Sequence, residues 1–179
     1  MHLKDIYNLH KGQSVLILGC GESRDLPDMN EYDIIFGVNY IQQYLPCNYL
    51  LVIDKKENFN EERQSIILNK KIKSLFTCIS DWDSANYTNK IIFELGTLNL
   101  QNFGNKEGIV DHSIISPYVA ILICYYLGFS KIDVAGVDIL THDKLKNYRD
   151  VIKKDLTLLK TVLGKKGCKL TNLSPAFRW

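Results

Sequence analysis

The sequence lacks a long hydrophobic run, closely spaced cysteines and a start that resembles a signal peptide. Its most apolar stretch covers residues 119–127, whereas a helix that spans a bilayer needs about 20 apolar residues, so we expect no transmembrane segment. The five cysteines are scattered along the chain, which favours free thiols in a reducing compartment over a disulfide-bonded scaffold. The first residues contain no apolar run of the kind that signal peptides carry. Together these absences predict a cytoplasmic protein.

The sequence also lacks a strong excess of either charge, internal repeats and low-complexity tracts. It holds 22 Lys and Arg against 20 Asp and Glu, which gives a net charge of +2. The basic pairs at residues 153–154 and 165–166 are short and indicate solvated helix faces, so no nucleic-acid partner is expected. With 179 residues, 46% of them hydrophobic, the chain is long enough to form one well-packed domain over residues 1–179.

The clearest pattern that is present lies in residues 116–138. Ser116 precedes Pro117, and a proline at the first helical position marks a helix start with Ser116 as the N-cap. The apolar residues that follow predict a helix buried on most sides, and Gly128 predicts its left-handed end. Residues 131–135 then predict a short strand. A helix that leads directly into a strand is half of a βαβ unit, which implies a parallel sheet.

The rest of the chain alternates between strand-like and helix-like patterns. This alternation predicts an α/β fold: a single Rossmann-like, doubly wound, mostly parallel sheet with helices on both faces. The expected strands are residues 14–18, 34–37, 49–53, 75–79, 90–95, 131–135 and 168–173. The expected helices are residues 3–9, 57–68, 116–127 and 147–163. Residues 98–108 are expected to form an Asn- and Gly-rich loop.

The first expected strand ends in a glycine-rich turn, Gly19-Cys20-Gly21-Glu22-Ser23. Glycines in such a turn allow a tight bend and let the phosphates of a ligand approach backbone amides. The turn lacks the third glycine of the dinucleotide fingerprint, and it is not followed by the Gly-Lys-Ser/Thr of a P-loop. A tight strand-to-helix turn without any ligand is the alternative interpretation.

Further candidate site residues stand at the ends of other strands and at the start of the buried helix. They are Asn39, Asp54, Ser116, Gly136, Val137 and Asp138. The carboxyl ends of parallel strands and the N-termini of the helices that follow share one edge of the sheet, so we expect all of these residues to line one crevice. Each alone is typical of a cap or a turn, but their convergence favours a site for a nucleotide or a nucleotide sugar.

The glycine turn, Asn39, Ser116 with its helix, residues 127–132 and the Gly-Val-Asp strand end resemble the bacterial lipooligosaccharide sialyltransferases. In that family the equivalent residues hold the CMP part of CMP-sialic acid. The resemblance implies a glycosyltransferase that takes CMP-sialic acid or a similar CMP-sugar and a hydroxyl acceptor, without a cofactor. It covers roughly the first 55 residues and residues 116–138.

The sequence departs from that family at three site positions and in its lid. Cys20 replaces a nucleotide-contacting Asn, Glu22 replaces a Pro, and Asp54 replaces an Asn. Most of the lid that carries the family's catalytic histidine is missing. His142 lies in its remnant and is the preferred general base, with Asp54 as the second choice. The short lid implies either that the donor is also hydrolysed, or that an acceptor or a partner subunit of a homo-oligomer completes the site.

Two alternative functions remain open. The same skeleton resembles the hydroxymethylpterin diphosphokinase-like proteins, which implies Mg²⁺-dependent diphosphate transfer from ATP with Asp54 and Asp138 on the metal. No His and Cys cluster has the spacing of a zinc site, and the run after Asp54 has no Asp-x-Asp motif. The other alternative is a non-catalytic nucleotide-binding module. The missing third glycine argues against a redox dinucleotide such as NAD.

Overall fold

Seven strands form the central sheet of the computed structural model, in the order β5-β4-β3-β2-β1-β8-β9. They are β1 (Ser14–Leu18), β2 (Ile34–Val38), β3 (Tyr49–Leu51), β4 (Ile72–Thr77), β5 (Tyr87–Ile92), β8 (Lys131–Ala135) and β9 (Lys169–Asn172). Every pairing between described strands is parallel. The structure describes residues 1–69, 72–83, 86–97, 100, 103–104, 106–139, 145–175 and 177–179. The predicted α/β, Rossmann-like fold is confirmed.

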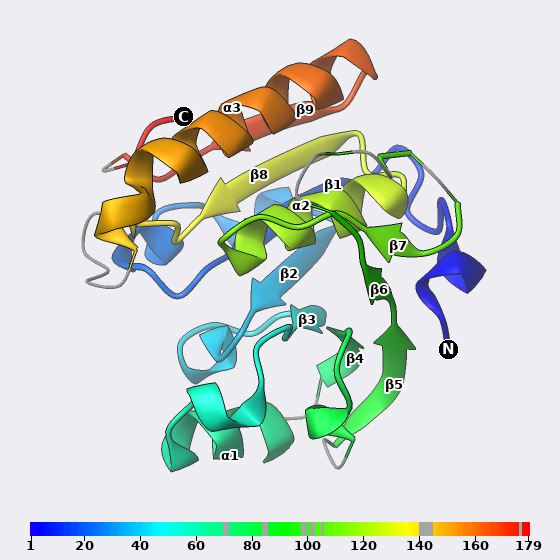
Figure 1. Cartoon of the computed structure of the whole chain (residues 1–179), viewed down its shortest axis with the longest axis vertical. Coiled ribbons are helices and arrows are strands. Elements are labelled where there is room, and N and C mark those ends of the chain that lie inside the picture. Colours follow the sequence, from blue (N-terminus) through cyan, green and yellow to red (C-terminus); the bar gives the residue numbers. More distant parts are fainter. Residues whose placement is uncertain are drawn as a thin grey trace.

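Helices cover both faces of this sheet (Figure 1). The helices α2 (Ser116–Tyr126) and α3 (Arg149–Lys165) pack on one face, and α1 (Glu61–Asn69) packs on the other. The sheet therefore has a hydrophobic core on each face. In β1, Val15 and Ile17 pack in the core on the side of α2 and α3, whereas Leu16 and Leu18 pack in the core on the side of α1. Because both faces of a covered parallel strand are buried, β1 is a continuous apolar run instead of an alternating one. Among the described residues, no helix combines the length and apolarity that a membrane span requires.

The helix α2 is buried along almost its whole length, as predicted, and differs from the prediction only at its start. Ile115 has the extended N-cap conformation, and Ser116 is already the first helical residue. The Ser116 hydroxyl donates to Asp54 Oδ2 instead of capping the helix amides, which explains why the N-cap lies one residue earlier. Gly128 ends the helix with φ +90°, the left-handed conformation expected of it.

Several other predicted boundaries need correction. The helix predicted at residues 3–9 is a 3₁₀ turn, Leu3–Ile6. The helix predicted from residue 57 begins only at Glu61, because Asn60 Oδ1 accepts from the Arg63 amide and fixes the start there. The strand predicted at residues 90–95 divides into β5 and β6 (Glu94–Leu95), and β6 leaves the main sheet to pair with β7 (Ile109–Val110). The predicted loop at residues 98–108 lies partly outside the described residues.

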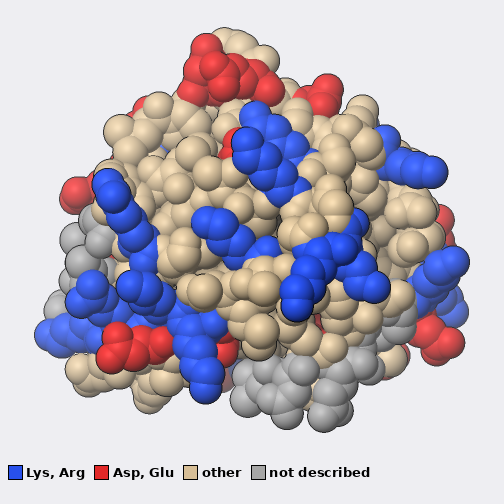
Figure 2. All heavy atoms as spheres, turned by 90° about the horizontal axis from the view of Figure 1, so that it is seen from above, with Lys and Arg blue, Asp and Glu red and all other residues tan. Residues whose placement is uncertain are grey.

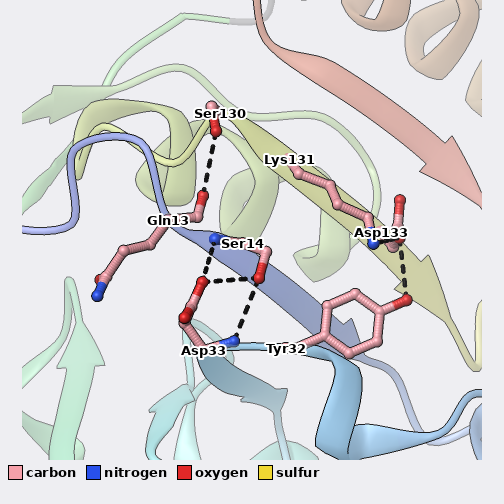
Figure 3. Close-up of polar contacts among 7 residues, drawn as sticks. All are labelled: Gln13, Ser14, Tyr32, Asp33, Ser130, Lys131 and Asp133. Carbon is pink, nitrogen blue, oxygen red and sulfur yellow. Dashed lines mark hydrogen bonds and ion pairs between the residues drawn. The ribbon is translucent and has the colours of Figure 1, made fainter.

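Polar contacts fix the amino ends of the central strands, as Figure 3 shows. The Ser14 amide and hydroxyl both donate to Asp33 Oδ2 at 2.8 Å. The bond from the amide, and to a smaller extent the bond from the hydroxyl, lowers the pKa of Asp33. The Tyr32 hydroxyl donates to the buried Asp133 Oδ2 at 2.9 Å, and Lys131 Nζ lies 3.3 Å from the same oxygen. These contacts tie β1, β2 and β8 together at the end of the sheet away from the predicted crevice.

The strand order reverses direction beside β1, and this reversal positions the site. From β1 the chain adds β2 to β5 on one side, whereas β8 and β9 are added on the other side. The last residues of β1 and β8, Leu18 and Ala135, are register partners. From these two neighbouring strands the chain therefore continues toward opposite edges of the sheet. In open α/β sheets, ligands bind in the crevice that such a divergence creates.

Candidate functional site

A cleft of about 1020 Å³ opens at the carboxyl edge of the sheet, at the divergence of β1 and β8. It is lined by most of the residues predicted from the sequence, from five separate segments: Gly19, Cys20, Gly21, Glu22, Asn39, Asp54, Ser116, Gly136, Val137 and Asp138. Ser23 lies behind this lining, only 7% exposed. His142 lies outside the described residues. The structure thus brings together the predicted residues that it describes.

The glycine turn and the turn after β8 pack backbone against backbone. The amides of Gly19 and Gly21 donate to the carbonyl oxygens of Ala135 and Gly136, both at 2.9 Å. A Cβ on Gly19 would lie 2.4 Å from the Gly136 oxygen, and a Cβ on Gly136 would lie 2.3 Å from the Gly19 oxygen. The amide hydrogens of both turn glycines are therefore used inside the protein, which differs from the phosphate-facing role expected from the sequence. The glycines make this close approach possible.

A buried hydrogen-bond network fixes the floor of the cleft. Ser23 Oγ donates to Asp138 Oδ1 at 2.8 Å, and the Ser23 amide donates to Asp138 Oδ2 at 2.7 Å. Ser23 Oγ also accepts from the Gly136 amide at 2.9 Å and lies 2.7 Å from Ser174 Oγ. Ser174 Oγ in turn accepts from the Val137 amide at 3.1 Å. With Ser174 as the donor to Ser23, both hydroxyls are satisfied and the chain of donors ends on the Asp138 carboxylate.

This network gives Ser23 and Asp138 a structural role that the strand-end pattern did not predict. Ser174 was missed as well, because it follows β9 in the last residues of the chain and only the fold carries it to the site. The signal that could have identified Ser174 is its position, two residues after the end of β9. A short polar residue directly after a parallel strand lies at the carboxyl edge of the sheet, whichever strand it follows.

We expect Ser174→Ala to destabilise the fold by about 1–3 kcal/mol, because it leaves the buried Val137 amide without an acceptor and removes one partner of Ser23. Urea unfolding measures the change. The matched control is Ser65→Ala on α1. This serine is exposed, and among the described side chains only Asn69 bonds to its hydroxyl, so the cost should stay within about 0.5 kcal/mol. Equal effects of the two substitutions would contradict the network.

Asp54 lies in the cleft beside the N-terminus of α2. Its Oδ2 accepts from Ser116 Oγ at 3.5 Å, and its backbone oxygen accepts from the Trp82 indole at 3.1 Å. Burial raises the pKa of Asp54, and the bond from Ser116 offsets part of this rise. A carboxylate that is partly desolvated and opens onto a cleft is suited to take a proton from a bound hydroxyl.

Asn39 offers an unused polar group at the cleft. It has φ +58°, and its amide donates to the Leu51 oxygen at 2.8 Å, which continues the β2–β3 ladder. Its side-chain Oδ1 is buried and has no hydrogen-bond partner among the described residues. Buried polar atoms are normally paired, so a ligand group is a natural partner for this side chain.

The cleft also contains a stacked pair that the sequence did not indicate. The Arg63 guanidinium lies 4.2 Å from the centre of the Tyr40 ring, and both residues line the cleft. Arg63 comes from α1 and is the one cationic side chain among the described lining residues, where Glu22, Asp54, Glu57 and Asp138 supply carboxylates. Its planar fork is suited to hold a phosphate or carboxylate group of a ligand.

Cys20, at the glycine turn, is bound to the protein and not poised to react. Its Sγ donates to the Val38 oxygen at 3.5 Å, and burial raises the pKa of this thiol to about 11. A thiol with such a pKa stays protonated at neutral pH, so it is a poor nucleophile. The site therefore offers a carboxylate and a guanidinium for chemistry, and its thiol serves to pack the turn.

Metal ligation was an alternative role for the strand-end aspartates. Among the residues that the structure describes, no three His, Cys, Asp or Glu side chains form a group suited to hold a metal ion. Asp54 and Asp138 both line the cleft, but the Asp138 oxygens accept from Ser23. A metal shared by the two carboxylates would have to coexist with these bonds.

A second, smaller cleft of about 370 Å³ lies at the other edge of the sheet. Its lining includes Gly12, Ser130 and Cys168, which precede β1, β8 and β9. None of the predicted site residues that the structure describes lines it. Ligands of open parallel sheets bind at the carboxyl ends of the strands, so the larger cleft is the better candidate.

Comparison with protein families and curated proteins identifies no relative of this chain. No protein-family model matches the sequence, and no curated protein is significantly similar to it. The function of the chain therefore has to be inferred from the cleft itself.

Proposed function

We propose that this chain is a glycosyltransferase-like enzyme that uses a nucleotide-sugar donor, CMP-sialic acid or a similar CMP-sugar, and a hydroxyl acceptor. One observation carries the proposal: five separate segments converge on a single cleft at the divergence of β1 and β8. The position of the cleft favours a ligand at this edge of the sheet. Arg63 favours an anionic group, Tyr40 favours a planar one, and Asn39 Oδ1, which has no partner among the described residues, favours a hydrogen-bond donor. A nucleotide sugar has this composition.

In the proposed reaction, Asp54 accepts the proton of the acceptor hydroxyl. The acceptor oxygen attacks the anomeric carbon of the donor sugar, and the bond from that carbon to the phosphate oxygen of CMP breaks. The electron pair of this bond leaves on the phosphate, where Arg63 and the N-terminus of α2 offset the negative charge. No described side chain caps α2, so its N-terminus is open toward the cleft. His142 stays the other predicted base.

The proposal predicts that CMP stabilises the protein in a thermal-shift panel of CMP, CDP, UDP, GDP, ATP and NAD. At 100 times the dissociation constant, a ligand adds about 2.7 kcal/mol, which raises the Tm of a chain this long by roughly 5–11 °C. Asn39→Ala is the matched variant. It should reduce the shift with CMP, and it removes no described hydrogen bond of Asn39 Oδ1. Alanine at the φ of +58° lowers the Tm of the free protein, because this conformation costs about 1–2 kcal/mol for residues other than Gly, Asn and Asp, so each shift is measured from the variant's own Tm. If no nucleotide in the panel raises the Tm, the nucleotide site is rejected.

The acidic lining of the cleft favours a second candidate, Mg²⁺-dependent diphosphate transfer from ATP to a small alcohol. Four described carboxylates and one guanidinium line the cleft, and a bound divalent cation would balance that charge. Donor turnover with and without EDTA separates the two candidates. Sugar transfer that persists in EDTA supports the first, whereas ATP turnover that EDTA abolishes supports the second. A Tm shift without any turnover would instead indicate a non-catalytic nucleotide-binding module.

A further inference from the structure

The small net charge of the chain hides an uneven distribution. Residues 145–179 hold nine Lys and Arg against two Asp, a net charge of +7. Residues 1–144 hold 13 Lys and Arg against 18 Asp and Glu, a net charge of −5. Short basic pairs in the sequence indicated ordinary solvated helix faces. The net charge of the last 35 residues shows that these pairs belong to a longer basic segment. Where its side chains lie on the surface depends on the fold.

The fold gathers these basic side chains on one side of the molecule. All nine are exposed, and we call them the basic face: Lys146, Arg149, Lys153, Lys154, Lys160, Lys165, Lys166, Lys169 and Arg178. They lie on α3, directly before or after it, or on β9 and the segment after it. Figure 2 views the molecule from this side and shows Lys and Arg across its middle, with Asp and Glu nearer the rim.

The acidic residues of this segment neutralise little of the basic face. Asp155 is half-buried, and its Oδ2 accepts from Ser113 Oγ at 2.5 Å, so the carboxylate is turned toward the protein. Asp150 is exposed in the first turn of α3, where the helix dipole stabilises a negative charge. Asp150 stands three and four residues before Lys153 and Lys154, but among the described residues no ion pair joins an acidic side chain to a Lys or Arg of α3.

Exposed apolar side chains lie among the lysines. Leu158 is 52% exposed and Val151 is 49% exposed, on the outer side of α3, and Tyr148 directly before the helix is 50% exposed. Leu158 stands four residues after Lys154 and seven before Lys165, so these side chains share one stripe of the helix. The core side of α3 is formed by other residues, such as Leu156 and Leu159.

We propose that the basic face docks this protein on the surface of a bilayer that contains anionic phospholipids. A straight helix with Lys and Arg around exposed Leu, Val and Tyr matches such a surface, because cations attract the headgroups while apolar side chains enter the acyl boundary. A nucleic-acid backbone would reward the same cations and leave Leu158 and Val151 without a favourable contact. The apolar stripe therefore selects the lipid surface. The proposal does not depend on the reaction in the cleft.

Flotation of the full chain with vesicles tests this proposal. We expect binding to vesicles of phosphatidylcholine with 30 mol% phosphatidylglycerol, and little binding to phosphatidylcholine alone. Lys153→Glu/Lys154→Glu should lower the partition coefficient at least about tenfold. Binding should also weaken from 0.1 M to 1 M salt, over which the screening length falls from about 10 Å to 3 Å. Val151→Ser/Leu158→Ser should weaken binding at constant charge.

The matched control is Lys4→Glu/Lys73→Glu, which makes the same change in net charge at exposed lysines outside the basic face. It should bind anionic vesicles nearly as well as the wild type. Circular dichroism and the Tm of each variant verify folding. Equal losses in the two lysine pairs, or unchanged binding of Lys153→Glu/Lys154→Glu, would overturn the proposal. So would retention of a duplex DNA oligonucleotide with no vesicle binding, which would assign the face to a nucleic acid.

Discussion

Asp54→Asn is expected to lower glycosyl transfer by about 10²–10⁴-fold, the usual contribution of a general base. Asparagine has the shape of aspartate, and its amide oxygen accepts from the Ser116 hydroxyl as the carboxylate does. It has no basic oxygen, so the proton of the acceptor has no destination. Donor binding should survive, because the nucleotide contacts proposed at Asn39 and Arg63 are untouched. Initial rates and a CMP thermal shift, measured on the same variant, separate the two effects.

The raised pKa of Asp54 also sets a pH dependence for rate and stability. The rate should fall on the acidic side as Asp54 is protonated, at a pH above its ordinary value of 3.8. Burial disfavours the ionised carboxylate in the folded state, so the wild type loses stability as pH rises from this ordinary value through the raised folded pKa. Asp54→Asn avoids the loss. Its Tm advantage should be absent at low pH, appear across that interval and then stay constant.

Two variants keep this assignment of the base open to refutation. Ser116→Ala removes the hydroxyl that donates to Asp54, so the acidic limb of the rate profile should move to higher pH while activity at pH 8 is largely kept. His142→Ala tests the other predicted base. If transfer by Asp54→Asn is close to that of the wild type and His142→Ala is inactive, the proton goes to the histidine and Asp54 has only a positioning role.

Gly136→Ala is expected to have the largest effect on stability, a loss of about 3 kcal/mol or more. Two costs combine at this position. Its φ of +73° is a conformation that side chains rarely adopt, and the added Cβ would lie 2.3 Å from the Gly19 oxygen. The backbones of the turns directly after β1 and β8 meet here, so neither turn can move without disturbing the central strand that it follows. The Tm should drop by roughly 6–12 °C.

Gly12→Ala separates the two costs. Gly12 has a similar φ of +82°, but a Cβ there meets nothing within 4 Å, so only the conformational cost of about 1–2 kcal/mol applies. The excess loss in Gly136→Ala measures the close approach of the turns. Similar losses in both variants would mean that the turns after β1 and β8 do not touch as described. If Gly136→Ala is too unstable to purify, Gly19→Ala provides the same contact from the other side.

Local pattern was sufficient to predict β1 and β8 with their observed ends and α2 to within one residue at either end. These elements are apolar, short and bounded by glycine or proline, so their local conformational preferences and their burial favour the same structure. Prediction was poorer where polar composition left several conformations open. Residues 57–60 were predicted to begin a polar helix, but Asn60 caps α1, which therefore begins at Glu61. Nothing local showed that β6 would leave the sheet to pair with β7.

The sequence by itself determined that a glycine turn and polar strand ends would share one edge of a parallel sheet, because that edge follows from strand direction alone. Only the tertiary structure decided what each residue does there. Asp138 and Ser23 look like ligand groups in the sequence but bind each other, and Ser23 also contacts Ser174. Arg63 from α1 lies over Tyr40. The physical reason is distance along the chain. Contacts between residues of different elements, such as Ser23 and Asp138, which are 115 residues apart, depend on how strands and helices are ordered and packed, and no local pattern encodes that order.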